Sequence, residues 1–110
     1  MGFDKKKSRI GIAIATYSLA VGSTCPQLVK NRYAITSQAS TNPLIGEKIA
    51  KEIKKKDPLS TINKILNKDK FLEYRQIAVL SLSGDKYTHT GSKTKDFKGS
   101  ITSKNSIAIG

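Results

Sequence analysis

Apolar and small residues alternate near the start of the chain, in residues 10–15, where each isoleucine is followed by a glycine or an alanine. A period of two is typical of a β-strand, because successive side chains point to opposite faces. We therefore predict a strand with one bulky face and one face that a neighbouring backbone can approach closely. Gly22 favours a turn and Pro26 cannot continue a central strand, so residues 21–26 are predicted to form a loop.

The residues on either side of this stretch differ in polarity. Met1 to Arg9 is rich in lysine and is predicted to be a solvated turn or a frayed terminus. Tyr33 to Ala39 is predicted to be a second strand, which becomes polar at Thr36, Ser37 and Gln38. A polar strand end beside a loop suits the wall of a binding site.

Two helices are predicted in the middle of the chain. Asn42 followed by Pro43 is typical of a helix start, and the first helix is predicted to run to about Lys56. Asp57 and Pro58 repeat this arrangement, so one helix ends and another begins there. Apolar residues at helical spacing define the buried faces, and they are Ile45, Ile49 and Ile53, then Leu59, Ile62, Ile65 and Leu66. The expected surface ion pairs are Glu47 with Lys51 and Glu52 with Lys56.

The last third of the chain predicts a hairpin. Gln76 to Leu82 is an apolar strand candidate, Ser83 to Asp85 a turn, and Lys86 to Thr90 the return strand. Residues 93–98 are polar and are predicted to form a loop. A final strand is predicted over residues 106–109.

The length of 110 residues suits a single domain, residues 1–110, with one modest core. The formal net charge of +12 favours acidic partners such as nucleic acid. However, Arg9, Arg32 and Arg75 are the only arginines, and bidentate contacts to phosphate or guanine depend on arginine. A basic protein that binds nucleic acid or another acidic partner therefore stays as an alternative that is not favoured.

Cys25 is the only cysteine and His89 the only histidine, so we expect no metal site and no cofactor. A lone cysteine agrees with a reducing compartment, and the predicted location is cytoplasmic. Secretion is the alternative, because lysines precede the apolar run from Ile10 to Val21, as in a signal peptide. The run is too short to span a bilayer, so no membrane span is expected.

Most catalytic templates are absent, including the Walker loop, the dinucleotide fingerprint and the Gly-x-Ser-x-Gly elbow. Cys25 and His89 are a candidate thiol and imidazole pair, although their spacing does not bring them together. Several hydroxyl side chains are better explained as turn caps or wet strand faces, and they are Thr16, Ser18, Ser23, Thr36 and Ser37.

Several short motifs occur in one order along the chain. They are Gly11-Ile12-Ala13-Ile14-Ala15, Ala20-Val21-Gly22-Ser23 with Pro26, Thr36-Ser37-Gln38-Ala39 with Asn42-Pro43 and Gly46, Tyr74-Arg75-Gln76, Gly84, and Thr90-Gly91. In this order they resemble an uncharacterised bacterial and archaeal family of unknown function, placed in the N-terminal-nucleophile (Ntn) hydrolase superfamily. The similarity covers almost the whole chain.

The resemblance implies an α+β fold of the αββα type, with two stacked antiparallel sheets between helices. It also implies amide-bond hydrolysis as the reaction class. In that superfamily a Thr, Ser or Cys at the start of the first strand is the nucleophile, and its α-amine is the base. This chain is expected to lack that strand and the later half of the fold, and Gly2 has no nucleophilic side chain. We therefore expect a partial domain, uncertain as an enzyme and inactive in this form.

A partial sandwich exposes a sheet edge and an apolar face, so association into a homo-oligomer or with flanking sequence is expected. Five residues are candidates for any remaining site, and they are Ser23, Gln38, Asn42, Arg75 and His89. Each also has a structural explanation. These are turn bonds for Ser23 and Gln38, helix capping for Asn42, a surface pair for Arg75, and a wet hairpin face for His89.

Overall fold

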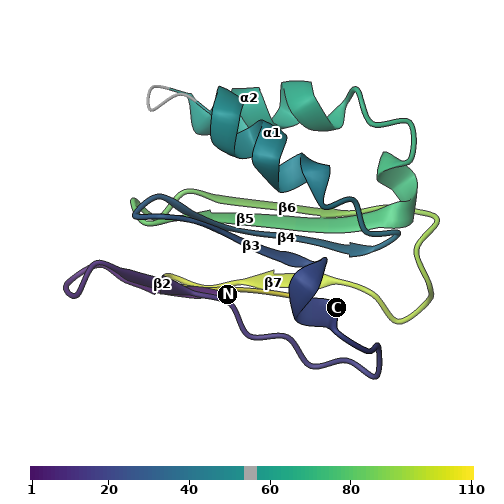
Figure 1. Ribbon diagram of the computed structural model, residues 1–110, viewed down its shortest axis with the longest axis horizontal. Helices are drawn as coiled ribbons and strands as arrows, with labels where there is room; N and C mark the ends of the chain where they lie inside the picture. The colour runs from purple at the N-terminus through teal and green to yellow at the C-terminus, as the bar shows by residue number, and fades with distance from the viewer. Residues whose placement is uncertain (54–56) are drawn as a thin grey trace.

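The computed structural model describes residues 1–53 and 57–110, whose helices and strands lie in three layers (Figure 1). Helices α1 (Leu44–Glu52) and α2 (Pro58–Leu66) form one outer layer. The middle layer is an antiparallel sheet in the order β3-β4-β5-β6. Its strands are β3 (Pro26–Val29), β4 (Tyr33–Ala39), β5 (Arg75–Ser81) and β6 (Lys86–Thr90). These findings confirm the mixed α+β class, the antiparallel strands and the two consecutive helices.

The third layer consists of two hairpins, which lie on the sheet face opposite the helices (Figure 1). One hairpin pairs β1 (Gly2–Asp4) with β2 (Arg9–Gly11), and the other pairs β7 (Ser100–Thr102) with β8 (Ile107–Ile109). Two short 3-10 helices complete the described elements, η1 (Val21–Ser23) and η2 (Leu72–Tyr74).

Strands β4 and β5 are the centre of the fold, because they pair over seven positions and are buried on both faces. Side chains alternate along each strand. Ile35 and Ile77 face the helices, whereas Ala34 and Ala78 face the hairpins. The small alanines allow the hairpin layer to approach the sheet closely.

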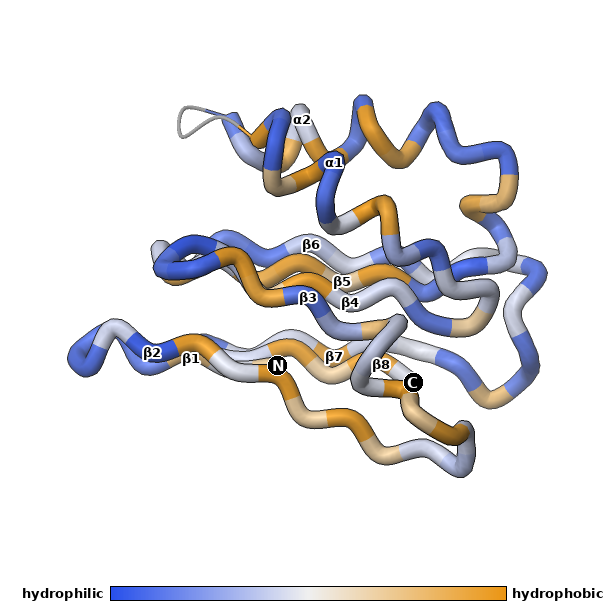
Figure 2. Tube along the Cα trace, viewed as in Figure 1, coloured by the Kyte–Doolittle hydropathy of each residue, from blue (hydrophilic) through white to orange (hydrophobic). Residues whose placement is uncertain are grey.

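The main core lies between the helices and this sheet. Ile49 of α1 and Ile62 of α2 pack with Ile35, Ile77 and other apolar residues of the two central strands. Figure 2 shows this pattern along the chain, with hydrophobic positions on the central strands and hydrophilic positions on the outer parts of the helices. The sequence places apolar residues every three or four positions, so each helix buries one face.

A second, smaller core lies between the sheet and the hairpins. It contains Ala34, Ala78, Leu80 and Ile107, with Phe3 packed against it. The two hairpins are joined to each other: Gly2 forms a bridge with Ser106, and the ammonium of Met1 donates a 2.8 Å hydrogen bond to the carbonyl of Ile107. The hairpins therefore act as one layer built from both ends of the described chain.

The structure corrects several predictions in the first third of the chain. Met1 to Arg9 is not a frayed terminus, because it contains β1 and the start of β2. The strand predicted over residues 10–15 is wrong beyond Gly11. Residues 12–16 have no regular structure, because no strand in the described part of the chain pairs with them.

Other boundaries also differ. The predicted loop at residues 21–26 contains η1, and Pro26 opens β3, an edge strand that the sequence did not predict. An edge position suits proline, since it has no N–H to donate. The first helix ends at Glu52, and Lys56, with its predicted pair to Glu52, lies outside the described residues. The second helix begins as predicted, because the Asp57 side chain accepts a 3.1 Å hydrogen bond from the Ser60 N–H.

The later strands were predicted more closely. β5 is Arg75–Ser81 against the predicted 76–82, and β6 has the predicted bounds. β7 was not predicted. The predicted surface pair of Glu47 with Lys51 is confirmed at 3.8 Å. The expected association with a further copy stays a prediction.

Replacing Ile49 by alanine tests the main core. Ile49 is fully buried between α1 and the central sheet, so the cavity left by Ile49→Ala lowers the free energy of unfolding by about 2 to 5 kcal/mol. Leu44→Ala on the same helix is the control, because Leu44 is 55% exposed, and it costs less than about 1 kcal/mol. Urea unfolding followed by circular dichroism measures both, and equal losses would contradict the layer arrangement.

Candidate functional site

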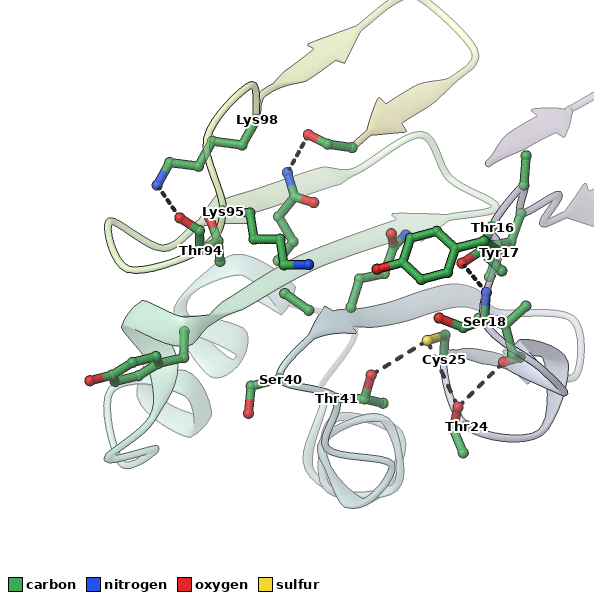
Figure 3. Close-up of a pocket in the computed structure, with 18 of the residues that line it drawn as sticks. Thr16, Tyr17, Ser18, Thr24, Cys25, Ser40, Thr41, Thr94, Lys95 and Lys98 are labelled. Carbon is green, nitrogen blue, oxygen red and sulfur yellow. Dashed lines mark hydrogen bonds between the residues drawn. The ribbon is translucent and has the colours of Figure 1, made fainter.

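A pocket with a volume of about 660 Å³ lies where β4 and β5 meet the loops of the hairpin layer (Figure 3). Its floor is formed by the polar end of β4 and the start of β5, at Gln38, Ala39 and Gln76. Residues 14–19 and 93–98 form its sides. The predicted polar strand end beside a loop is therefore part of a pocket wall.

A row of polar side chains crosses the sheet at the pocket floor. Gln38 is opposite Gln76, which is opposite Thr90. The Gln76 carboxamide N–H₂ lies 2.8 Å from the carbonyl of Gly110, 3.1 Å from that of Gly99 and 3.2 Å from the Thr90 hydroxyl. Gln76 therefore joins the ends of the second hairpin to the central sheet.

The loop that forms one side of the pocket is fixed at both ends. Gly91 lies against the backbone of Glu73, and a Cβ atom there would come within 2.2 Å of the Glu73 carbonyl oxygen. Only glycine allows this approach. At the other end, the Lys98 ammonium donates hydrogen bonds to the carbonyls of Ser92 and Thr94, at 2.8 and 2.9 Å.

Three lysines line this side of the pocket, and they have different surroundings. Lys98 is bonded within its own loop, and the Lys93 ammonium lies 5.1 Å from the centre of the Tyr74 ring. Lys95 extends into the pocket in Figure 3, and no hydrogen bond or ion pair joins it to another residue in the described ranges. The Lys95 ammonium is thus available to an anion in the pocket.

The pocket rim is apolar and open to solvent. Tyr17 is 93% exposed and Leu19 is 98% exposed, and both lie in the irregular segment after β2. Phe97 on the facing loop is fully exposed, and its φ of 57° places it in the left-handed region. These are the three most exposed large hydrophobic residues among those described, and all three line this pocket.

Cys25 also lines the pocket, but the structure does not bring it to His89. The buried Cys25 sulfur lies 3.5 Å from the Thr41 hydroxyl and 3.9 Å from that of Thr24. Cys25 lies beside Ser37, which pairs with Ile77, which pairs with His89. Three strand spacings, or about 14 Å, therefore separate Cys25 from His89.

Two predicted site residues have the structural roles expected of them. The Ser23 hydroxyl donates a 2.8 Å hydrogen bond to the carbonyl of Ala20, which closes a turn. The Asn42 side chain accepts a 3.1 Å hydrogen bond from the Leu44 N–H at the start of α1. Neither residue lines the pocket.

Arg75 does not form the ion pair at the surface that the sequence suggested. Its guanidinium is buried and lies 2.7 Å from the carboxylate of Asp69, and it also donates a hydrogen bond to the carbonyl of Ser40. Burial alone would raise the pKa of Asp69, but hydrogen bonds from Arg75 and from the Phe71 N–H, with the charge of Arg75, lower it on balance. Because Ser40 lines the pocket, Arg75 positions one of its walls.

His89 faces the helix layer, away from the pocket. Its Nε2 lies 3.1 Å from the carbonyl of Leu72 and 4.0 Å from the carboxylate of Glu73. The backbone N–H of Ser92 donates to the same carboxylate and is the main reason that the pKa of Glu73 is lowered. His89 is half-buried, so it is not on a wet hairpin face as predicted, and it links β6 to η2.

Of the five predicted candidates, the structure therefore places only Gln38 in the pocket, and Arg75 behind its wall. Sequence reasoning missed Gln76 and Lys95. Gln76 had a signal, because it is a polar residue at the start of an otherwise apolar strand. Lys95 had none, since it is one of many lysines.

Within residues 1–53 and 57–110, no group of acidic, cysteine and histidine side chains is placed to hold a metal ion. In the same ranges, no helix is long and apolar enough to cross a membrane. The lysines lie on separate elements: Lys5 to Lys7 in the β1–β2 turn, Lys48 and Lys51 on α1, and Lys93 to Lys98 near the pocket.

The whole chain, residues 1–110, matches the family described as "Family of unknown function (DUF1028)". The chain belongs to this family. Among solved structures, it is similar to a DUF1028 protein of Silicibacter pomeroyi, with 32% sequence identity and a TM-score of 0.77. The similarity covers 86% of this chain and 43% of that protein, so this chain corresponds to less than half of its relative. No curated protein matches the chain significantly. The resemblance to a family of unknown function is thus confirmed.

The buried pair of Arg75 and Asp69 predicts a pH-dependent stability. The pKa of Asp69 is lower in the folded than in the unfolded state, so the ionised pair stabilises the protein above the unfolded pKa of about 3.9. This stability is lost as the pH falls through the lower, folded value. Arg75→Met is expected to lower the free energy of unfolding at pH 7 by about 2 to 3 kcal/mol.

The difference between wild type and Arg75→Met should shrink as the pH falls below about 4, because Asp69 then becomes protonated in both. Urea unfolding across this range measures it. Lys51→Met, which removes the exposed pair with Glu47, is the control and should cost less than about 0.5 kcal/mol. A difference that is constant with pH would show that the charge of Asp69 is not involved.

Proposed function

We propose that this chain is the ligand-binding part of an Ntn-hydrolase-like αββα sandwich, and that its pocket binds a small organic anion with an apolar portion. The three layers support the fold proposal, since a helix layer, a sheet and a second strand layer are three of the four layers of such a sandwich. The family membership is compatible with it.

The observation that carries the binding proposal is the position of Lys95. Its ammonium extends into a pocket of about 660 Å³, and no acidic side chain in the described ranges pairs with it. A carboxylate in the pocket gives this charge a partner. The exposed Tyr17, Leu19 and Phe97 on the rim supply apolar contacts for the rest of the molecule.

Amide-bond hydrolysis is the reaction class that the Ntn superfamily implies. A nucleophile needs a base within hydrogen-bond reach. In the described residues, the hydrogen-bond partners of the Cys25 sulfur are hydroxyls, and His89 lies about 14 Å away across the sheet. We therefore propose binding without hydrolysis by these residues.

Binding to nucleic acid stays the second hypothesis. The charge of +12 favours it, but the lysines lie in the β1–β2 turn, on the helices and beside the pocket, which are different sides of the fold. Phosphate contacts make affinity fall steeply with salt. A labelled 20-nucleotide single strand that fails to bind at about 50 mM salt would remove this hypothesis.

Charge reversal at Lys95 tests the pocket. N-acetyl-phenylalanine carries a carboxylate and an aromatic ring, and calorimetry is expected to show that Lys95→Glu weakens its binding about tenfold. Lys104→Glu makes the same change in net charge on the β7–β8 turn, away from the pocket, and should leave the affinity within about twofold. The neutral amide of the same compound should bind wild type more weakly.

Equal weakening by both charge reversals would show a general field effect and would contradict a site at Lys95. No binding of the anion to wild type would remove the proposal. In the same samples, release of phenylalanine over a day would contradict binding without hydrolysis, whereas intact compound supports it.

A further inference from the structure

A second cavity, of about 140 Å³, lies between the central sheet and the hairpin layer. Its walls are Thr36 and Gln38 of β4, Met1, Ala13 and the three residues of β8. This is enough space for about four water molecules, or for one small organic group.

The Thr36 hydroxyl is the unusual feature of this cavity. Thr36 is only 2% exposed, and its Oγ1 has no hydrogen-bond partner among the described residues. It is the only buried side-chain oxygen or nitrogen in those ranges of which this is true. Buried hydroxyls nearly always have a partner, since leaving one unpaired is destabilising.

The wall beside Thr36 offers a second polar group. Gln38 lies two residues along the same strand, on the same face, and no hydrogen bond joins its carboxamide to another described residue. A carboxamide both donates and accepts hydrogen bonds, as does a hydroxyl. Gln38 also lines the larger pocket, so the cavity and the larger pocket lie on either side of this residue.

Among the described residues that line the cavity, no side chain is charged. The nearby ammonium of Met1 already donates to the carbonyl of Ile107. A cation would lose its hydration here without gaining an opposite charge, whereas a neutral polar group would be matched by the hydroxyl and the carboxamide.

We propose that this cavity is a binding subsite for a small uncharged group that both donates and accepts hydrogen bonds, such as a primary amide or an alcohol, held by Thr36 and Gln38. The group accepts or donates a hydrogen bond at Thr36 Oγ1 and makes the complementary bond with the Gln38 carboxamide. This subsite does not depend on Lys95 or on an anionic ligand in the larger pocket.

Acetamide is a suitable probe, because its four heavy atoms fit the cavity, and acetamidinium is the cation of the same shape. A fragment of this size binds in the millimolar range, so amide resonances of the protein are followed by NMR up to about 100 mM probe. We expect saturable shifts at Thr36, Gln38 and Ile107 with acetamide and none with acetamidinium.

Thr36→Val keeps the shape of the side chain and removes its hydroxyl, so the affinity for acetamide should fall at least about tenfold. Thr36→Ser keeps the hydroxyl and should retain them. Thr88→Val is the matched control: Thr88 lies on the same sheet face, two strands away, and its hydroxyl accepts a 3.4 Å hydrogen bond from Ser100. It should bind acetamide like wild type.

Two results would overturn the proposal. The first is an equal response of Thr36→Val and wild type to acetamide, which would place the probe elsewhere. The second is no saturable response in wild type, which would show that the hydroxyl is satisfied by water only. Either result leaves the test of Lys95 unaffected, because that test uses a different ligand and a different pocket wall.

Discussion

The burial of the β4–β5 pair on both faces is the constraint on which the other elements depend. Seven residue pairs join the two strands, and their side chains supply the inner surface of both cores. Isoleucines face the helices and alanines face the hairpins. The helix layer and the hairpin layer therefore lie at different distances from the sheet. Both the helices and the short hairpins bury their apolar residues against these two strands.

The start of β5 connects this core to the pocket. Arg75 and Gln76 are neighbours in sequence, so their side chains point to opposite faces of the sheet. Arg75 holds the chain at Ser40 on one side, and Gln76 holds the ends of the second hairpin on the other. Two polar residues at one strand end therefore position the pocket walls, which explains why an apolar strand begins with them.

The sequence predicted the elements whose own pattern is strong and missed those that depend on distant partners. The helices, β4 and β5 have clear periodicity and caps, and they were found. By contrast, β7 has three exposed residues and is a strand only because it pairs with β8. Dependence on distant partners also explains why only part of the site was predicted. Gln38 was identified from a polar strand end, whereas the roles of Thr36 and Arg75 depend on what the fold places around them.

The joining of β1 to β8 has a consequence for the order of folding. Gly2 pairs with Ser106, so the hairpin layer closes a loop that spans nearly the whole described chain, whereas β4 to β6 and the helices make contacts over shorter separations. Contacts between distant residues form late, because closing long loops loses more entropy. During synthesis, the alanine face of the central sheet therefore stays uncovered until β8 has left the ribosome, and an uncovered apolar sheet face favours aggregation.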